Sequence, residues 1–270
     1  MRNSGIGGQA VIEGIMMRNQ DRYSIGVRKP DKSIEVKVED YRSFIPCKTL
    51  TKIPFVRGVF NFIDSMVIGM KTLTYSASFY EDEEDAGKPK DEKSEALMMG
   101  GTVALSIVLA IGIFMLLPYF AAGLFRRLTD SALVISVLEG VLRLVIFLGY
   151  IALISRMEDI QRVFQYHGAE HKCINCIEHG LELNVVNVRA SSKEHKRCGT
   201  SFIMIVMVIS ILFFMVIRTD TIWLRIVSRI VLIPVIAGVS YEFLSFAGKH
   251  DSKLVDILSR PGMWMQGLTT

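Results

Sequence analysis

The sequence has few cysteines and little excess of charge of either sign. Four cysteines occur among 270 residues, and the formal net charge is +4. A charge this small and dispersed argues against a nucleic-acid groove, which needs clustered lysine and arginine. The chain has no P-loop, and Gly5 and Gly7 lack the rest of a dinucleotide fingerprint. We therefore expect no nucleic acid among its partners.

Long stretches without charge are the main feature that is present. Half of the residues are hydrophobic, the mean hydropathy is +0.37, and no charged residue occurs from Ala96 to Phe125. A membrane-spanning helix needs about 20 apolar residues. Four stretches meet this length, at about 98–125, 132–155, 200–217 and 228–248. They predict a mainly α, polytopic membrane protein with a four-helix transmembrane bundle. The lipid bilayer is then a partner of the protein.

The basic residues predict the orientation of these spans. Lysine and arginine gather before the first span, between the second and third, and after the fourth. The positive-inside rule then places both termini and the central loop 156–199 in the cytoplasm, with the spans in the cell membrane. The apolar run from Ala10 to Met17 is too short for a cleaved signal and contains Glu13. The cysteines fall on the predicted reducing side, as thiols or ligands: Cys47, Cys173, Cys176 and Cys198.

Residues 1–80 are predicted to form a small cytoplasmic α+β domain. Ser24–Arg28 and Ile34–Val38 alternate apolar and polar residues around a Pro-Asp-Lys turn, which indicates a hairpin. The Gly7-Gly8 pair suggests a strand or tight turn whose backbone must come close to another part of the protein. From Val56 to Ser76, apolar residues recur at helical spacing, so this helix either covers the hairpin or lies on the bilayer surface. The domain could bind a protein partner.

The charge-rich segment 81–95 reads as a solvated linker to a membrane domain, 96–270. Within that domain, Glu139 and Arg143 are four residues apart inside the second predicted span. An intramembrane charge is a functional candidate, so the two residues suggest a polar translocation path. The alternative is a self-neutralising pair that faces other helices.

The most informative motif is H-x-x-E-H at His167, Glu170 and His171. On a helix, the two histidines share a face and Glu170 lies beside them, so a divalent metal could bind with a carboxylate over its open position. This is the spacing of inverzincin metallohydrolases, in which the glutamate is a general base. We expect the helix of the second span to continue into this motif, just below the membrane.

A third metal ligand must come from further along the chain. Inverzincins use a downstream glutamate, and the candidates are Glu178 and Glu242; the latter lies inside the last span and would need a recessed pocket. A second cluster, His195, Arg197 and Cys198, immediately precedes the third span. Arg197 could stabilise an oxyanion or bind an anionic group.

A different metal site would use other atoms of the same region. Cys173, Cys176, His195 and Cys198 have nearly the spacing of a two-knuckle zinc ribbon, which would be a closed structural site. In the absence of any metal, the histidines would be hydrogen-bonded residues at the interface and the cysteines small buried hydrophobes.

Several blocks of sequence together resemble the bacterial YqhQ family, an uncharacterised group of multi-span membrane proteins described as predicted metal-dependent enzymes. The blocks include Gly7–Arg18, Tyr166–Lys172 and Arg197–Phe202, and shorter matches occur at Ser240–Glu242 and around Gln266. Lys196 departs from the family, which usually has proline there. The resemblance groups the following residues: Glu13, His167, Glu170, His171, His195, Arg197, Cys198 and Glu242.

These observations lead to one functional hypothesis and one alternative. The hypothesis is a metal-dependent membrane hydrolase, with zinc on His167 and His171, Glu170 as general base and an unknown substrate. The alternative is a non-enzymatic membrane scaffold, or a small transporter that uses Glu139 and Arg143. The two predict opposite effects of Glu170→Gln, which would abolish hydrolysis but leave a scaffold working.

Overall fold

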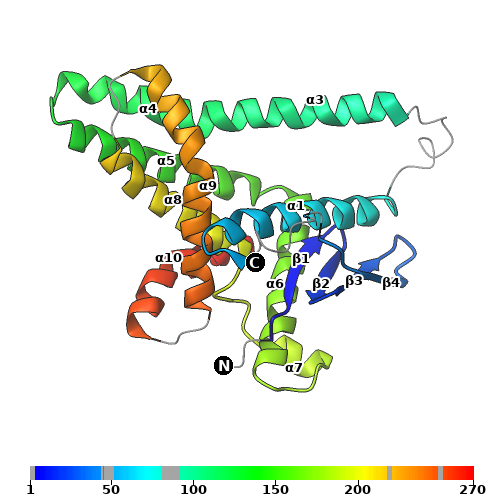
Figure 1. Ribbon diagram of the computed structural model, residues 1–270. Coiled ribbons are helices and arrows are strands. Elements are labelled where there is room, and N and C mark those ends of the chain that lie inside the picture. Colours follow the sequence, from blue (N-terminus) through cyan, green and yellow to red (C-terminus); the bar gives the residue numbers. More distant parts are fainter. Residues whose placement is uncertain (1–3, 44, 46–51, 81–91, 218–220, 249–251) are drawn as a thin grey trace. The chain divides into compact units, whose positions relative to one another are not determined.

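The computed structural model is mainly helical with one small antiparallel sheet (Figure 1), which confirms the predicted fold class. It describes residues 4–43, 45, 52–80, 92–217, 221–248 and 252–270. Cys47 and most of the predicted linker, 81–91, lie outside the described residues. Helix α3 (Glu92–Ile111) begins within the remainder of that linker.

The sheet is a meander of four strands in the order β1-β2-β3-β4. The strands are β1 (Gly7–Val11), β2 (Gly14–Asn19), β3 (Arg22–Arg28) and β4 (Ile34–Asp40). The predicted hairpin is confirmed, because Ser24 pairs with Val38 and Gly26 with Val36. Its turn is closed by the Asp31 carboxylate, which accepts hydrogen bonds from the backbone and hydroxyl of Ser33.

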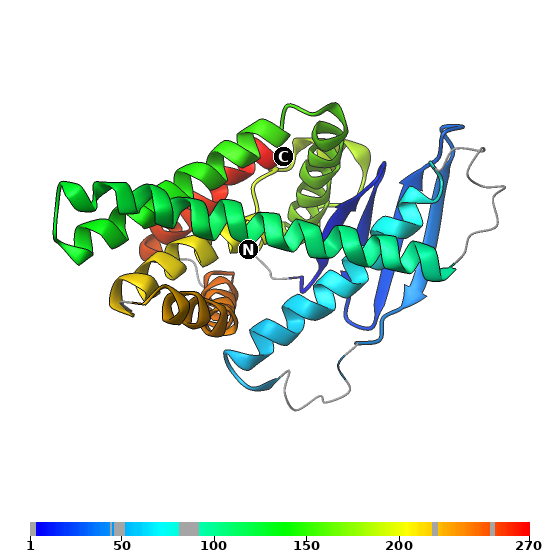
Figure 2. The same cartoon turned by 90° about the horizontal axis from the view of Figure 1, so that it is seen from above.

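Two helices, α1 (Val56–Ala77) and α6 (Glu158–Glu178), pack on opposite faces of this sheet (Figure 2). Successive side chains of a strand point to opposite faces. On β1, Gly8 faces Glu170 of α6, whereas the next residue, Gln9, contacts Gly69 of α1. The hydrophobic core lies on the α1 side and contains the following residues: Val11, Met16, Tyr23, Ile25, Val27 and Ile68.

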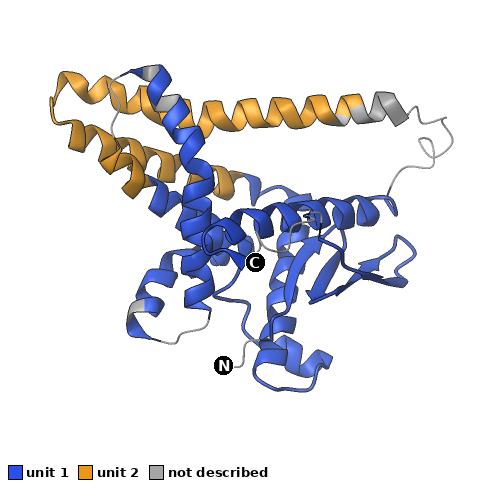
Figure 3. Ribbon diagram, viewed as in Figure 1, with its two compact units in different colours: residues 1–80, 154–210, 219–270 blue, residues 81–153, 211–218 orange. Residues whose placement is uncertain are grey.

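The chain divides into two compact units (Figure 3). Unit 1 joins residues 1–80 to 154–210 and 219–270, so the sheet packs with the central region and the last apolar helix. It also contains α7 (Val185–Ala190), most of α8 (Gly199–Val216), α9 (Ile222–Ala247) and α10 (Lys253–Thr269). Unit 2 comprises residues 81–153 and 211–218.

Unit 2 contains a series of consecutive apolar helical segments, and the regular α-helix is interrupted near Pro118. Helix α3 leads into a π-helical turn (Gly112–Leu116), α4 (Leu117–Gly123) and a 3-10 turn (Leu124–Arg127). Proline has no N–H to donate to the carbonyl four residues earlier, that of Phe114. Arg143 of α5 (Ala132–Ile154) donates from Nε to this carbonyl at 3.1 Å, and from Nη2 to Glu139 at 2.9 Å. The two intramembrane charges thus form a buried, hydrogen-bonded pair within unit 2.

Among the residues that the structure describes, four helices are long and apolar enough to cross a membrane: Gly100–Arg127, Ala132–Ile154, Gly199–Val216 and Val227–Ala247. They correspond to the four predicted spans and are those of a multi-pass membrane protein. One expectation was wrong. The second span does not continue into the H-x-x-E-H motif, because α5 ends at Ile154 and Met157 has an extended backbone. Glu158 and Asp159 then favour a new helix N-terminus through its dipole.

Candidate metal centre

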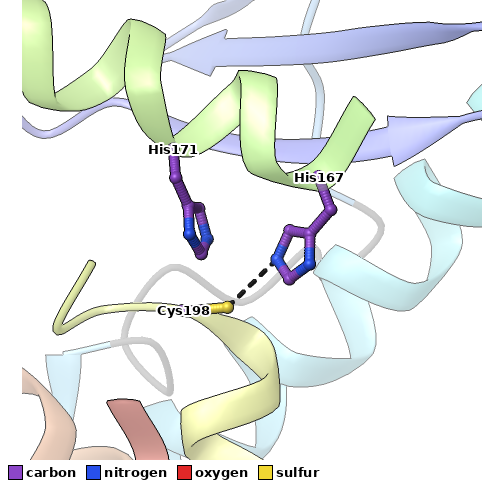
Figure 4. Close-up of side chains that lie close together, drawn as sticks. All are labelled: His167, His171 and Cys198. Atoms are coloured by element: carbon purple, nitrogen blue, oxygen red, sulfur yellow. Dashed lines mark hydrogen bonds between the residues drawn. The ribbon is translucent and has the colours of Figure 1, made fainter. Parts of the chain in front are cut away.

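His167 and His171 lie one turn apart on α6, on the face turned away from the sheet (Figure 4). Their rings are in edge contact, with centroids 4.4 Å apart. Cys198, immediately before α8, completes the group: one ligand atom from each residue lies within 4.8 Å of the others. We call these three residues the His/Cys cluster. His171 and Cys198 are buried and His167 is partly buried.

Backbone carbonyls determine the tautomers of both histidines. Nδ1 of His171 lies 2.6 Å from the Lys193 carbonyl oxygen, and Nδ1 of His167 lies 2.8 Å from that of Thr269. A carbonyl oxygen only accepts, so each Nδ1 must carry the proton. In a neutral ring Nε2 then carries a lone pair. Two Nε2 lone pairs are therefore presented by one face of α6. In each ring the other nitrogen, Nδ1, donates to a backbone carbonyl, as it does in metal-binding histidines.

Cys198 is held by the start of α8. Its carbonyl oxygen accepts from the backbone of Phe202, and its Sγ lies 3.4 Å from the backbone nitrogen and 3.1 Å from Oγ1 of Thr200. The thiol also lies 3.1 Å from Nε2 of His167, the atom that carries the lone pair. The α8 N-terminus thus aims the sulfur at the two imidazoles.

The chemistry of these donors fits a metal ion. Two imidazole nitrogens and one thiolate are ligands that zinc prefers, and three protein ligands leave the fourth tetrahedral position open, as in catalytic sites. The carbonyls of Lys193 and Thr269 are the outer partners that such histidines require. His167, His171 and Cys198 are therefore the residues that could hold zinc.

Glu170, on the same helix as the two histidines, is buried against β1. A Cβ atom at Gly8 would lie 2.7 Å from Cγ and Oε1 of Glu170, which explains why glycine is required there. The Oε2 atom is buried and has no hydrogen-bond partner among the described residues. Burial raises the pKa of this carboxyl to about 7, against the opposing effect of a charged His167. A proton on Glu170 is therefore exchangeable near neutral pH.

Glu178 accepts hydrogen bonds from four groups and is not brought into the His/Cys cluster. Oε1 accepts from the backbone and hydroxyl of Ser4 and from Arg197, and Oε2 lies 3.4 Å from Nε2 of His195. Burial alone would raise the pKa of Glu178, but the Ser4 hydrogen bonds and the Arg197 charge hold it below its ordinary value. Burial also lowers the pKa of His195 to about 4. This network joins the N-terminal segment, α6 and the segment before α8.

Glu242, the other predicted third ligand, is engaged elsewhere. Its carboxylate forms a two-pronged ion pair with Arg57 of α1, with Nε of Arg57 2.7 Å from Oε1, and also accepts from the backbone of Phe55 at 3.1 Å. The cost of a carboxylate inside an apolar span is thereby offset by a cation from another helix.

The remaining predicted residues have structural partners. Glu13, in the β1–β2 turn, pairs with Arg162 and accepts from the Tyr166 hydroxyl at 2.9 Å, which ties the sheet to α6. Cys176 is buried and lies 3.4 Å from the Glu182 carbonyl oxygen, and Cys173 is partly buried. Within the described part of the chain, the one cluster that could hold a metal includes neither of them.

Several supporting residues were missed by motif reasoning. Gln266 of α10 hydrogen-bonds both the backbone nitrogen and the carbonyl of His195, at 2.9 and 2.7 Å, and also the Ser201 hydroxyl. Thr269 supplies the carbonyl that orients His167. Both residues lie about 70 to 100 residues downstream of the histidines that they support. In the sequence, only the resemblance to the YqhQ family around Gln266 pointed to them.

Four membrane-length helices, a small sheet and a buried His/Cys cluster define a multi-pass membrane protein with a candidate metal centre. The chain belongs to the family described as "Protein of unknown function (DUF1385)", whose model matches residues 53–270. It is 36% identical over 272 residues to "Uncharacterized protein YqhQ" of Bacillus subtilis (strain 168), covering 98% of this chain and 86% of that protein. No solved structure matches the chain.

Proposed function

We propose that the protein is a zinc-dependent membrane enzyme, of the hydrolase class, in which His167, His171 and Cys198 hold the metal. The observation that carries the proposal is the pair of backbone-oriented imidazoles facing a helix-capping thiol. Bound zinc would supply Lewis-acid activation of water and of a carbonyl oxygen. Cys198 replaces Glu178 and Glu242 as the third ligand, because both carboxylates are engaged by arginine.

Glu170 is the residue that we assign as general base. It follows His167 by three residues, is buried, and has an oxygen without a hydrogen-bond partner in the described structure. A group with a pKa near the working pH is best suited to take up and release a proton. Arg197 we assign as a positioning residue, since its guanidinium binds Glu178 and thereby holds the segment that leads to Cys198.

With four spans, both termini lie on the same side of the membrane. We propose that this side, together with residues 156–199, is cytoplasmic, as the distribution of lysine and arginine predicts. Cys198 of the His/Cys cluster directly precedes Gly199, the first residue of a candidate span. Substrates would therefore carry their peptide, amide or acyl bond close to the membrane surface.

Metal content of detergent-purified protein tests the proposed ligands. We expect close to one zinc per chain in the unmodified protein and loss of most of it in His171→Ala and in Cys198→Ser. The matched controls are His179→Ala, an exposed histidine at the end of the same helix, and Cys173→Ser, a thiol outside the cluster. Zinc that persists in His171→Ala and Cys198→Ser would contradict the assignment.

An open coordination position distinguishes a catalytic site from a structural one. In cobalt-substituted protein, a sulfur-to-cobalt charge-transfer band that disappears in Cys198→Ser would show thiolate ligation. Addition of azide should then shift the visible bands if a position is open, and leave them unchanged in a closed site. Glu170→Gln should retain the cobalt spectrum, because Glu170 is not assigned as a ligand, but should abolish hydrolysis once a substrate is found.

The 3.1 Å contact between His167 and Cys198 favours a second candidate, a thiol nucleophile with His167 as its base. His171→Ala separates the two candidates, because it removes a zinc ligand and leaves the His167–Cys198 pair in place. Alkylation of Cys198 by iodoacetamide that is fast in this variant, and slow when His167 is also replaced by alanine, would support the dyad.

A further inference from the structure

Helix α1 exposes a continuous apolar stripe along one face. The stripe contains Val56, Ile63, Met66, Val67 and Met70, which recur at helical spacing and are between 37% and 55% exposed. Soluble helices bury such a face. We therefore expect another apolar surface to cover the stripe of α1.

The charged residues of α1 are all on another flank and are all engaged. Arg57, Asp64 and Lys71 are seven residues apart and so share one side of the helix. Arg57 pairs with Glu242; Asp64 accepts from the hydroxyls of Tyr41 and Ser43; and Lys71 pairs with Glu39 at 2.7 Å. The exposed stripe itself carries no charge.

The face of α1 opposite the stripe is already used by the sheet. Ile68 belongs to the hydrophobic core, Gly69 contacts Gln9, and the Ser76 hydroxyl accepts from the backbone of Ile12 at 3.1 Å. The sheet thus fixes the rotation of α1 about its own axis, and the stripe cannot turn inward without breaking this packing.

The N-terminal end of α1 is fixed to an apolar span. The Phe55 carbonyl packs directly on Gly238 of α9, and Gly58 packs on Tyr241, whose Cβ would lie 2.6 Å from an added Cβ. Gly238 lies nine residues before Ala247, where the candidate span ends, a distance of about 14 Å along the helix. The start of α1 is therefore level with the apolar part of α9, and not beyond its end.

A second span contacts the same helix. The ring of Phe62 packs on that of Phe202 in α8, with centroids 5.6 Å apart. Phe55 has a left-handed backbone (φ 66°) and an exposed side chain, and its amide is held by Glu242. An exposed phenylalanine side chain is more favourable in an apolar surrounding than in water.

From these contacts we infer that α1 is an interfacial membrane helix, whose stripe of Val56, Ile63, Met66, Val67 and Met70 contacts the acyl chains of the bilayer. The occupant is lipid because α1 begins within the apolar length of α9 and contacts α8, so its uncovered face continues the apolar surface of those two spans. The helix would hold the sheet at the membrane surface. This inference does not depend on zinc or on catalysis.

Tryptophan fluorescence in lipid nanodiscs tests the inference on the full-length protein. Trp223 and Trp264 are first replaced by phenylalanine, and Met66→Trp is added as the only reporter. With phosphatidylcholine brominated near the upper part of its acyl chains, this reporter should lose about half of its emission, because interfacial helices sit at that depth. Ser65→Trp is the matched control, exposed but about 100° around the helix, and should lose much less.

Aqueous iodide separates the other outcomes. A Met66→Trp reporter that iodide quenches and bromolipid does not would place the stripe in water and overturn the inference. One that neither reagent quenches would show that a second copy or another protein covers the stripe, which also overturns it. Met70→Trp repeats the measurement if Met66→Trp lowers the melting temperature, so that misfolding is not mistaken for a negative result.

Discussion

At the scale of single residues, the contacts of Gly8 and Glu170 show how a strand and a helix share one narrow space. Glu170 fills the position that a side chain at residue 8 would occupy, and it does so as a buried carboxyl with an unpartnered oxygen. The glycine is therefore as much a part of the site as the H-x-x-E-H motif. The Gly7-Gly8 pair had predicted close approach, but not which side chain approaches.

We predict that Gly8→Ala destabilises the protein by about 1–3 kcal/mol, the usual cost of overpacking. The neighbouring Gly7→Ala should change stability by less than about 0.5 kcal/mol, because nothing lies within 4 Å of its added Cβ. Thermal unfolding in detergent measures both. In a Glu170→Ala background the cost of Gly8→Ala should largely disappear; an unchanged cost would mean that the clash is with another group.

At the scale of elements, the junction of α1 and α9 is built from two glycines and one ion pair. Gly58 leaves room for the Tyr241 side chain and Gly238 for the Phe55 carbonyl. Arg57 pairs with Glu242 in the same junction. The positions concerned are about 180 residues apart in the chain. Hydropathy identified both helices. The pattern of apolar residues within one helix, however, does not show which other helix it packs against.

Gly238→Ala should separate these helices, because the added Cβ would overlap the Phe55 carbonyl oxygen and backbone atoms cannot yield as a side chain can. We expect a loss of about 1–3 kcal/mol of unfolding free energy. Gly267→Ala in α10 is the control: it meets nothing within 4 Å and should be neutral or stabilising by up to about 1 kcal/mol. Equal melting temperatures for the two variants would argue against a tight α1–α9 junction.

At the scale of the whole molecule, unit 1 is assembled from three separate segments, and the His/Cys cluster and its supports come from two of them, 154–210 and 219–270. Helix α6 supplies both imidazoles, the start of α8 supplies the thiol, and α10 supplies the Thr269 carbonyl. A metal bound there would join parts of the chain that are otherwise linked by hydrogen bonds such as those of Gln266. Zinc should therefore stabilise the folded chain as well as activate water.

Zinc added to chelator-treated protein should raise the unfolding free energy by about 2.7 kcal/mol when its free concentration is one hundred times its dissociation constant. The rise should be absent in His171→Ala, which lacks one ligand, and present in His179→Ala. Scanning calorimetry at several zinc concentrations provides the measurement. The same rise in His171→Ala would place the bound zinc at another site.

The sequence by itself determined the four spans, the hairpin, helix α1 and the placing of His167 and His171 on one helix face. Each of these depends on periodicity within about 20 residues, which local composition encodes. Only the tertiary structure decided that Cys198 joins the histidines while Glu178 and Glu242 bind arginines, and that α5 and α6 are separate helices. Those outcomes depend on which distant segments pack together. The sequence offered Glu178 and Glu242 as the third ligand and placed Cys198 in a separate zinc-ribbon site, because spacing along the chain does not show which side chains meet.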